Sequence, residues 1–238
     1  MTTFDILTVK CPHCGTLMTH YELMSYTVHD LESWSDGKVD AGIPEMKRAG
    51  ICAGCRKEFW IEDAKLPRDF EPHAGEELET VKDVYDLDWI FDDDREVKAI
   101  IYYYNLLKDG FADTDEREYY LRSHLLWSVN DLVRYRPAWW RARNFGMLTR
   151  MLNSRRKGKR KFEVFDLIHT ENLERLIFLL IKSGDVDLLY LAELYREAGN
   201  LDKAAEILEK VEEKGKTWRM IRKKIRKKDR IAFKLRSA

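Results

Sequence analysis

Residues 10–15 are KCPHCG and residues 52–55 are CAGC. These two Cys-x-x-Cys pairs use every cysteine of the 238-residue chain: Cys11, Cys14, Cys52 and Cys55. A structural Zn²⁺ ion takes four tetrahedral ligands, and a two-residue spacer lets both sulfurs of a pair point at one ion. The two pairs therefore predict a zinc site with four cysteine ligands. Because four sulfurs leave no open position for water, we expect the zinc to be structural.

Three other uses of these cysteines stay open at the level of sequence. Cys-Pro-His-Cys is also the active-site pattern of DsbA-like thiol oxidants, although that chemistry needs a thioredoxin-type setting with the first cysteine at a helix start. A nearby histidine (His13, His20 or His29) could replace one sulfur as a ligand. Disulfides are disfavoured, because a chain without a signal-peptide pattern is expected in the reducing cytoplasm.

The segments around the two pairs have the composition of short strands. Residues 4–10 and 17–28 are rich in β-branched and aromatic side chains, and residues 57–62 (KEFWIE) would form a return strand. Residues 30–50 contain three glycines and a proline and predict a long loop. We expect a zinc-ribbon-like β module over residues 1–66.

The rest of the chain has the pattern of helices, so the predicted fold class is α+β and mainly α. Residues 67–94 are acidic, hold two prolines and predict a linker. Residues 95–214 carry apolar side chains three and four positions apart, which predicts a helical domain, and residues 215–238 predict a basic C-terminal helix. The expected helices cover residues 96–108, 119–132, 144–152, 171–182, 186–198, 201–214 and 217–235.

One helical stretch, LLYLAELYREAGNLDKAAEILEKV at residues 188–211, resembles a tetratricopeptide repeat. Ala192 and Ala204 would lie where its two helices cross, Gly199 would end the first helix, and Asn200 suits the turn. The final proline of the family pattern is absent. The resemblance implies a helical-repeat (tetratricopeptide-like) domain that binds a protein or peptide. A plain helical bundle with one similar hairpin is the alternative.

The order of these parts resembles uncharacterised bacterial proteins of the domain-of-unknown-function 2225 family. The resemblance rests on KCPHCG (10–15), on WSDGK (34–38) and on the stretch from CAGC to FW (52–60). In that family two widely spaced Cys-x-x-Cys pairs precede tetratricopeptide-like helices. The resemblance implies this architecture and brings no known activity.

The formal net charge of zero hides a division along the chain. Residues 1–94 hold 9 basic and 21 acidic side chains, whereas residues 95–238 hold 33 basic and 21 acidic ones. This basic half could contact nucleic acid, with a loop at 150–161 and the adjacent Trp139 and Trp140 adding to its surface. It could instead dock on the acidic half. The candidate phosphate contacts are Arg222, Lys223, Lys224, Arg226, Lys227 and Lys228.

Sequence motifs of common enzymes are missing, including the phosphate-binding loop, the dinucleotide fingerprint and the zinc-protease pair. The longest apolar runs have six residues, far below the roughly 20 of a membrane helix. We therefore assign no catalytic residue and expect a cytoplasmic, non-enzymatic scaffold with a protein or peptide partner. A nucleic-acid accessory protein that uses the ribbon and the basic helix is the second hypothesis. A thiol-disulfide oxidoreductase is the third.

Overall fold

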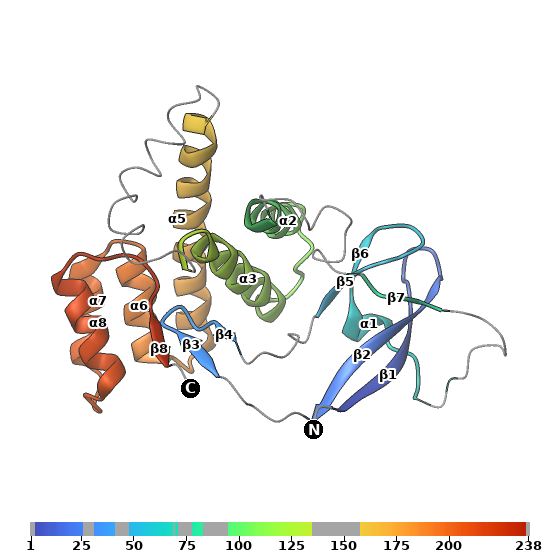
Figure 1. The fold of residues 1–238 in the computed structure, drawn as a ribbon, viewed down its shortest axis with the longest axis horizontal. Coiled ribbons are helices and arrows are strands. Elements are labelled where there is room, and N and C mark those ends of the chain that lie inside the picture. The colour runs from blue at the N-terminus through green and yellow to red at the C-terminus, as the bar shows by residue number, and fades with distance from the viewer. Residues whose placement is uncertain are drawn as a thin grey trace. The chain divides into compact units, whose positions relative to one another are not determined.

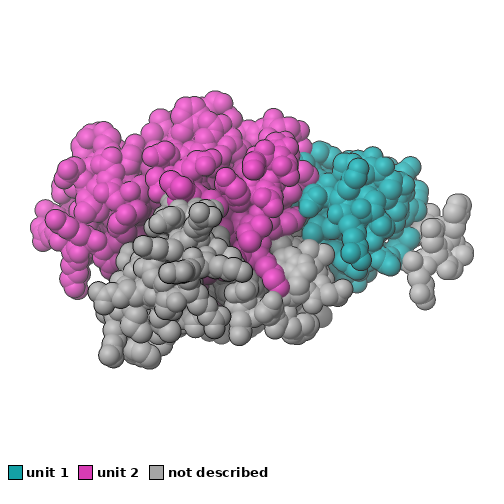
Figure 2. Space-filling view, turned by 90° about the horizontal axis from the view of Figure 1, so that it is seen from above, with its two compact units in different colours: residues 1–31, 41–95 teal, residues 32–40, 96–238 magenta. Residues whose placement is uncertain are grey.

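The computed structural model describes residues 3–25, 31–40, 48–68, 70, 78–82, 95–134 and 158–236. Within these residues the fold is mixed α and β and mainly helical, as predicted (Figure 1). The chain divides into two compact units (Figure 2): unit 1 is Met1–Leu31 with Ala41–Arg95, and unit 2 is Glu32–Asp40 with Glu96–Ala238. No helix in the described part of the chain is both long and apolar enough to cross a membrane.

Unit 1 consists of two small sheets and one helical turn. Its elements are β1 (Thr3–Lys10), β2 (Leu17–Ser25), β5 (Ala49–Ile51), β6 (Glu58–Trp60), α1 (Ile61–Ala64) and β7 (Glu79–Thr80). β1 pairs with β2 and β5 pairs with β6, both antiparallel. Because strand side chains alternate between faces, one face of the β1–β2 hairpin buries Val9 and Met18, which pack with Phe59 and Ile61 around Cys11 and Cys52.

The predicted strands at 4–10 and 17–28 are confirmed over residues 4–10 and 17–25, and residues 26–28 lie outside the described residues. Of the linker predicted at 67–94, residues 69, 71–77 and 83–94 also lie outside them, and the prediction is wrong for part of the rest. β7 pairs in parallel with β2, and residue 82 forms a bridge with residue 51. This stretch passes so close to β5 that a Cβ atom on Gly50 would lie 2.3 Å from the Val81 side chain. Residues 79–82 therefore belong to the packed unit.

Unit 2 is a set of helices completed by a small sheet. Its helices are α2 (Arg95–Lys108), α3 (Asp115–Arg134), α5 (Gly158–Ser183), α6 (Leu188–Glu197), α7 (Leu201–Glu209) and α8 (Lys216–Arg226). Its strands are β3 (Glu32–Trp34), β4 (Val39–Asp40) and β8 (Lys234–Arg236). The core combines leucines and isoleucines of α3, α5, α6 and α7 with Trp218, Ile221 and Phe233. Helices α3, α5, α6, α7 and α8 therefore share one apolar core.

The junction between α6 and α7 lies where the sequence predicts it: α6 ends at Glu197 and α7 begins at Leu201. Gly199 has φ +84°, a left-handed conformation that glycine adopts without a steric penalty. The Asn200 side chain caps α7 by accepting a hydrogen bond from the Lys203 N–H (3.2 Å). Ala192 and Ala204 are fully buried. These features fit one helical hairpin, and the assignment to tetratricopeptide repeats stays a prediction.

Three helix predictions differ most from the structure in extent. The helix predicted at 201–214 is too long, because α7 ends at Glu209. α5 begins at Gly158, so the last part of the predicted loop 150–161 is helical; the predicted helix at 144–152 lies outside the described residues. The predicted C-terminal helix at 217–235 is too long, because α8 ends at Arg226 and the chain turns back as β8. The buried Arg196 side chain holds this turn by donating to the carbonyl groups of Asp229 and Ile231.

The largest correction concerns residues 32–40, which the sequence places in a loop of the zinc module at 1–66. They form the β3–β4 hairpin of unit 2, and β3 also pairs with β8. The Asp36 carboxylate in the hairpin turn is fully buried. It forms an ion pair with Arg134 and accepts a hydrogen bond from Asn130 Nδ2 (2.8 Å). Next to it, Lys38 Nζ lies 2.6 Å from Asp131. The hairpin is thus anchored to α3 by charge as well as by strand pairing.

The same buried network continues into α6. Asn130 Nδ2 also donates to Glu197 Oε2 (3.0 Å), and Arg196 pairs with Glu193 (Nε to Oε2, 2.7 Å). Burial raises the pKa of Glu197 well above its ordinary value, and the neighbouring carboxylates act in the same direction. Burial also raises the pKa of Asp36, while Arg134 opposes it. With Glu197 protonated, Asp36 and Glu193 face the guanidinium groups of Arg134 and Arg196, while Asp131 pairs with Lys38 beside Arg134.

Replacing Asp36 by alanine tests this anchor. We expect Asp36→Ala to lower the free energy of unfolding by about 3 kcal/mol, because it removes one partner of a buried ion pair. This value is at the low end of the range of about 3 to 5 kcal/mol for breaking a buried ion pair, because Asp131 remains 3.0 Å from Arg134 Nε. Urea titration followed by helical circular dichroism measures the change, and Asp185→Ala at an exposed position is the control. Equal effects of the two substitutions would contradict the prediction.

A second contact joins α3 to α5 and gives a pH dependence. Glu118 accepts hydrogen bonds from Arg175 (Nη2 to Oε2, 2.7 Å) and from Arg122 (Nε to Oε1, 2.7 Å). These bonds, the one from Arg175 foremost, lower the pKa of Glu118 to about 2. A carboxylate with a lowered folded-state pKa stabilises the fold above its unfolded pKa of about 4.3, and this contribution is lost as the pH falls toward the folded value.

We therefore expect Glu118→Gln to cost on the order of 2 kcal/mol at pH 7, after allowing for solvent screening of the half-exposed Arg175. The difference from the unchanged protein should shrink between pH 4.5 and pH 2. Urea unfolding at pH 7 and at pH 3 measures it, with Glu174→Gln on the exposed side of α5 as control. A difference that stays constant across this range would rule out the ion pair as its source.

Candidate metal centre

Each Cys-x-x-Cys pair lies on a tight turn between two antiparallel strands, and the two turns have the same backbone hydrogen bonds. In the first turn the Gly15 N–H donates to the Cys11 carbonyl (3.0 Å). At the matching place in the second turn the Arg56 N–H donates to the Cys52 carbonyl (2.9 Å). This shared geometry is the physical reason that a two-residue spacer brings both sulfurs of a pair to one side of the turn.

The residue after each pair has a left-handed backbone. Gly15 has φ +77° and Arg56 has φ +59°. Glycine tolerates this region, whereas a side chain there costs about 1 kcal/mol. The second turn therefore has a small energetic cost at Arg56. Binding of a metal ion by the four sulfurs would offset this cost.

All four cysteine sulfurs lie within 4.8 Å of one another. Two of the separations, Cys14 to Cys52 (3.6 Å) and Cys11 to Cys55 (3.8 Å), join one turn to the other. Sulfurs at about 2.3 Å from a central ion stand about 3.8 Å apart at the corners of a tetrahedron. A disulfide would need about 2.05 Å, so the cysteines are free thiols here. The predicted quartet is therefore positioned to hold one metal ion.

Hydrogen bonds and burial shift the pKa values of two of the thiols in opposite directions. The Thr16 hydroxyl lies 3.1 Å from Cys14 Sγ, and its hydrogen bonds lower the pKa of Cys14 to about 6. Burial raises the pKa of Cys11 to about 12. The four sulfurs thus cannot all be thiolates at neutral pH without a compensating charge, which a divalent cation at their centre would supply.

The histidine alternative has little geometric support. His13 Nε2 lies 2.9 Å from the Glu58 carbonyl oxygen, so this ring nitrogen is engaged in linking the first turn to β6. His20 lies on β2, and His29 is outside the described residues. Among the residues that the structure describes, the four cysteines form the one group of three or more potential ligands that converges in this way.

The basic candidates are placed on α8 and just after it. Lys224 differs from the rest, because its Nζ lies 2.5 Å from the Asp229 carboxylate and 5.2 Å from the centre of the Phe233 ring. It is therefore neutralised within the chain. Trp139, Trp140 and residues 150–157 lie outside the described residues.

Sequence reasoning missed two polar residues. It gave no role to Thr16, whose hydroxyl acts on the Cys14 sulfur, or to Asp36 in the buried network of unit 2. The signal for Asp36 was the stretch WSDGK, in which an acidic side chain stands between an aromatic residue and the glycine of a turn. For Thr16 the signal was its position two residues after a cysteine.

The four-sulfur centre predicts one bound metal ion per chain. We expect Cys52→Ser to weaken metal binding by a factor of about 100 or more. Mutation of a residue that only hydrogen-bonds to a metal ligand already weakens binding by about 10 to 100-fold, and here a ligand itself is lost. His13→Gln should bind the metal as the unchanged protein does. Titration with Co²⁺, followed by the thiolate-to-cobalt absorption bands, measures both variants. Loss of binding in His13→Gln, or full binding in Cys52→Ser, would contradict a site made of the four cysteines.

No protein-family model, curated protein or solved structure matches the chain. The similarity to the domain-of-unknown-function 2225 family therefore stays a prediction that rests on the three motifs at residues 10–15, 34–38 and 52–60.

Proposed function

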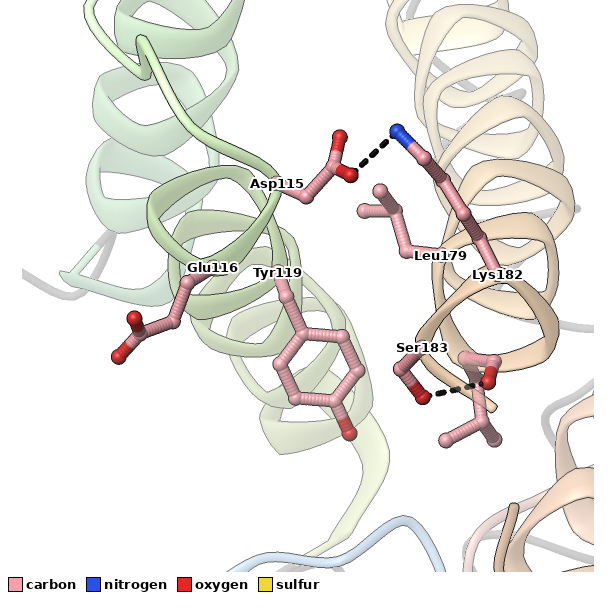
Figure 3. Close-up of a pocket in the computed structure, with 7 residues that line it drawn as sticks. Asp115, Glu116, Tyr119, Leu179, Lys182 and Ser183 are labelled. Atoms are coloured by element: carbon pink, nitrogen blue, oxygen red, sulfur yellow. Dashed lines mark hydrogen bonds and ion pairs between the residues drawn. The ribbon is translucent and has the colours of Figure 1, made fainter. Parts of the chain in front are cut away.

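We propose that the chain is a non-enzymatic scaffold, in which zinc stabilises unit 1 and the helices of unit 2 bind a protein or peptide. The observation that carries the binding role is a groove between α3 and α5 (Figure 3). The choice of metal follows from the ligands.

Zinc is the ion that this ligand set favours. A tetrahedral set of four thiolates is typical of zinc or of iron, whereas magnesium and calcium prefer oxygen ligands. Four protein ligands leave no place for a water molecule or a substrate, so the ion would have a structural role. The convergence of both pairs on one centre also favours metal binding over thiol-disulfide exchange, which needs one pair acting alone.

The groove has an apolar floor and an ion pair at one end. It has a volume of about 400 Å³ and is lined by Asp115, Glu116, Tyr119, Leu179, Leu180, Lys182 and Ser183. Figure 3 shows the Tyr119 ring and Leu179 between the two helices, with the ion pair of Lys182 and Asp115 at one end. The Ser183 hydroxyl donates to the Leu180 carbonyl (2.8 Å), so it is not a free polar group in the groove. Such a surface suits an apolar side chain of a partner.

Two apolar side chains of the same last turns of α5 are exposed outside the groove: Phe178 and Ile181 are 49% and 50% exposed. At 3.6 residues per turn, Ile181 lies on the side of α5 opposite Leu179 and Ser183, so the groove itself is the surface that the proposal uses. The partner that fits is an amphipathic helix or peptide with apolar anchors three or four residues apart.

Filling the groove tests the proposal. Peptides selected from a random library against the whole protein should bind in the groove, and Ser183→Arg should reduce their affinity at least tenfold. A cation at the C-terminal end of α5 suits the helix dipole, so the fold should be unaffected. Thr170→Arg, also exposed on α5 but outside the groove, is the matched control. Calorimetric titration measures both, and equal affinities would refute binding at this place.

A further inference from the structure

Helix α8 has one buried apolar side and one cationic side. Trp218 and Ile221 are only 4% and 1% exposed, and the Trp218 indole N–H donates to the Leu208 carbonyl (2.8 Å). From residue 216 to residue 228 the sequence is KTWRMIRKKIRKK, without one acidic residue. The surface that α8 leaves exposed is therefore dominated by positive charge.

The basic side chains gather around a shallow hollow of about 360 Å³. It is lined by the Trp218 side chain together with Arg219, Arg222, Lys223, Arg226 and Lys227. These basic positions are separated by three, four, seven and eight residues, so they share one side of the helix. At 1.5 Å per residue they extend over about 12 Å, a length comparable with three or four nucleotides at 3.4 Å per step.

Most of these charges are available to a ligand. Arg222 lies 3.7 Å from Glu209, and Lys224 is paired with Asp229. Within the described part of the chain, none of the remaining basic residues of the hollow pairs with a carboxylate; these are Arg219, Lys223, Arg226 and Lys227. Of the six candidates from the sequence, four line the hollow: Arg222, Lys223, Arg226 and Lys227. Lys224 and Lys228 do not line it, and the structure adds Arg219.

The kind of partner follows from what α8 does not expose. Insertion into an anionic membrane would require the apolar side of the helix, which is buried in unit 2. The centre of a protein interface is depleted in lysine, whereas this hollow holds Lys223 and Lys227 and its one aromatic ring, Trp218, is buried. Phosphates of a nucleic-acid backbone need only closely spaced cations, and arginine binds them with two parallel hydrogen bonds.

We propose that α8 is a binding site for the phosphate backbone of a nucleic acid, a function beyond the peptide-binding scaffold proposed above. Binding should depend little on base sequence. The aromatic side chain of the hollow, Trp218, is buried, and the cations of Lys214 and Arg222 lie 5.2 and 4.7 Å from the centre of its ring. It is therefore unavailable for stacking on a base.

Fluorescence anisotropy of the full chain with a labelled 20-nucleotide RNA tests the site. With four to five phosphate contacts, the slope of log K against log salt concentration should be about −3 for a single strand. Lys223→Gln/Lys227→Gln should reduce affinity at least tenfold at 50 mM salt and make this slope shallower by about 1 to 1.5. Lys203→Gln/Lys210→Gln, on α7 and at its C-cap, changes the net charge equally, but both lysines pair with Glu206, so the affinity of this variant should change little.

Three results would overturn the proposal. The first is absence of RNA binding at 50 mM salt, as expected if acidic parts of the chain cover α8. The second is an equal loss in both double variants, which would reflect net charge and not a site. The third is equally tight binding to vesicles of anionic lipid with the same dependence on Lys223 and Lys227. Ser183→Arg should leave RNA binding unchanged, so this test and that of the groove fail independently.

Discussion

The meeting of four cysteine sulfurs at one point is the constraint on which unit 1 depends. One turn joins β1 to β2 and the other joins β5 to β6, so the two turns belong to separate strand pairs. The apolar core around them is small. Binding of a metal ion by four cysteine thiolates contributes on the order of 10 kcal/mol to folding, as much as the whole net stability of a typical domain. The ion would thus replace the large core that this unit lacks, and it would offset the left-handed backbone at Arg56.

Unit 2 is stabilised by a different principle, in which buried charges organise an apolar helical core. The Asp36–Arg134 pair holds the β3–β4 hairpin against α3, and Arg196 holds the turn that follows α8. Both ends of this network meet in the small sheet, where β3 pairs with β8. The network also determines which basic side chains of α8 are neutralised within the chain. The turn held by Arg196 places Asp229 beside Lys224, whereas Lys223 and Lys227 stay exposed to a ligand.

Features with local causes could be predicted from the sequence. The cysteine quartet follows from the spacing within each pair, and the junction of α6 and α7 follows from Gly199 and Asn200. Features with distant causes could not. The hydrogen bond from the Phe233 N–H to the Ser35 hydroxyl joins residues 198 positions apart, and no periodicity indicates it. The burial of Asp36 contradicts the usual exposure of acidic residues, and the turn after α8 is held by Arg196 from another helix.

X-ray absorption at the zinc edge of the purified protein, combined with elemental analysis, tests the central claim most directly. The account predicts one zinc ion per chain with four sulfur neighbours at about 2.3 Å and no nitrogen or oxygen in the first shell. Absence of bound metal, iron in place of zinc, or a first shell with fewer than four sulfurs would contradict it.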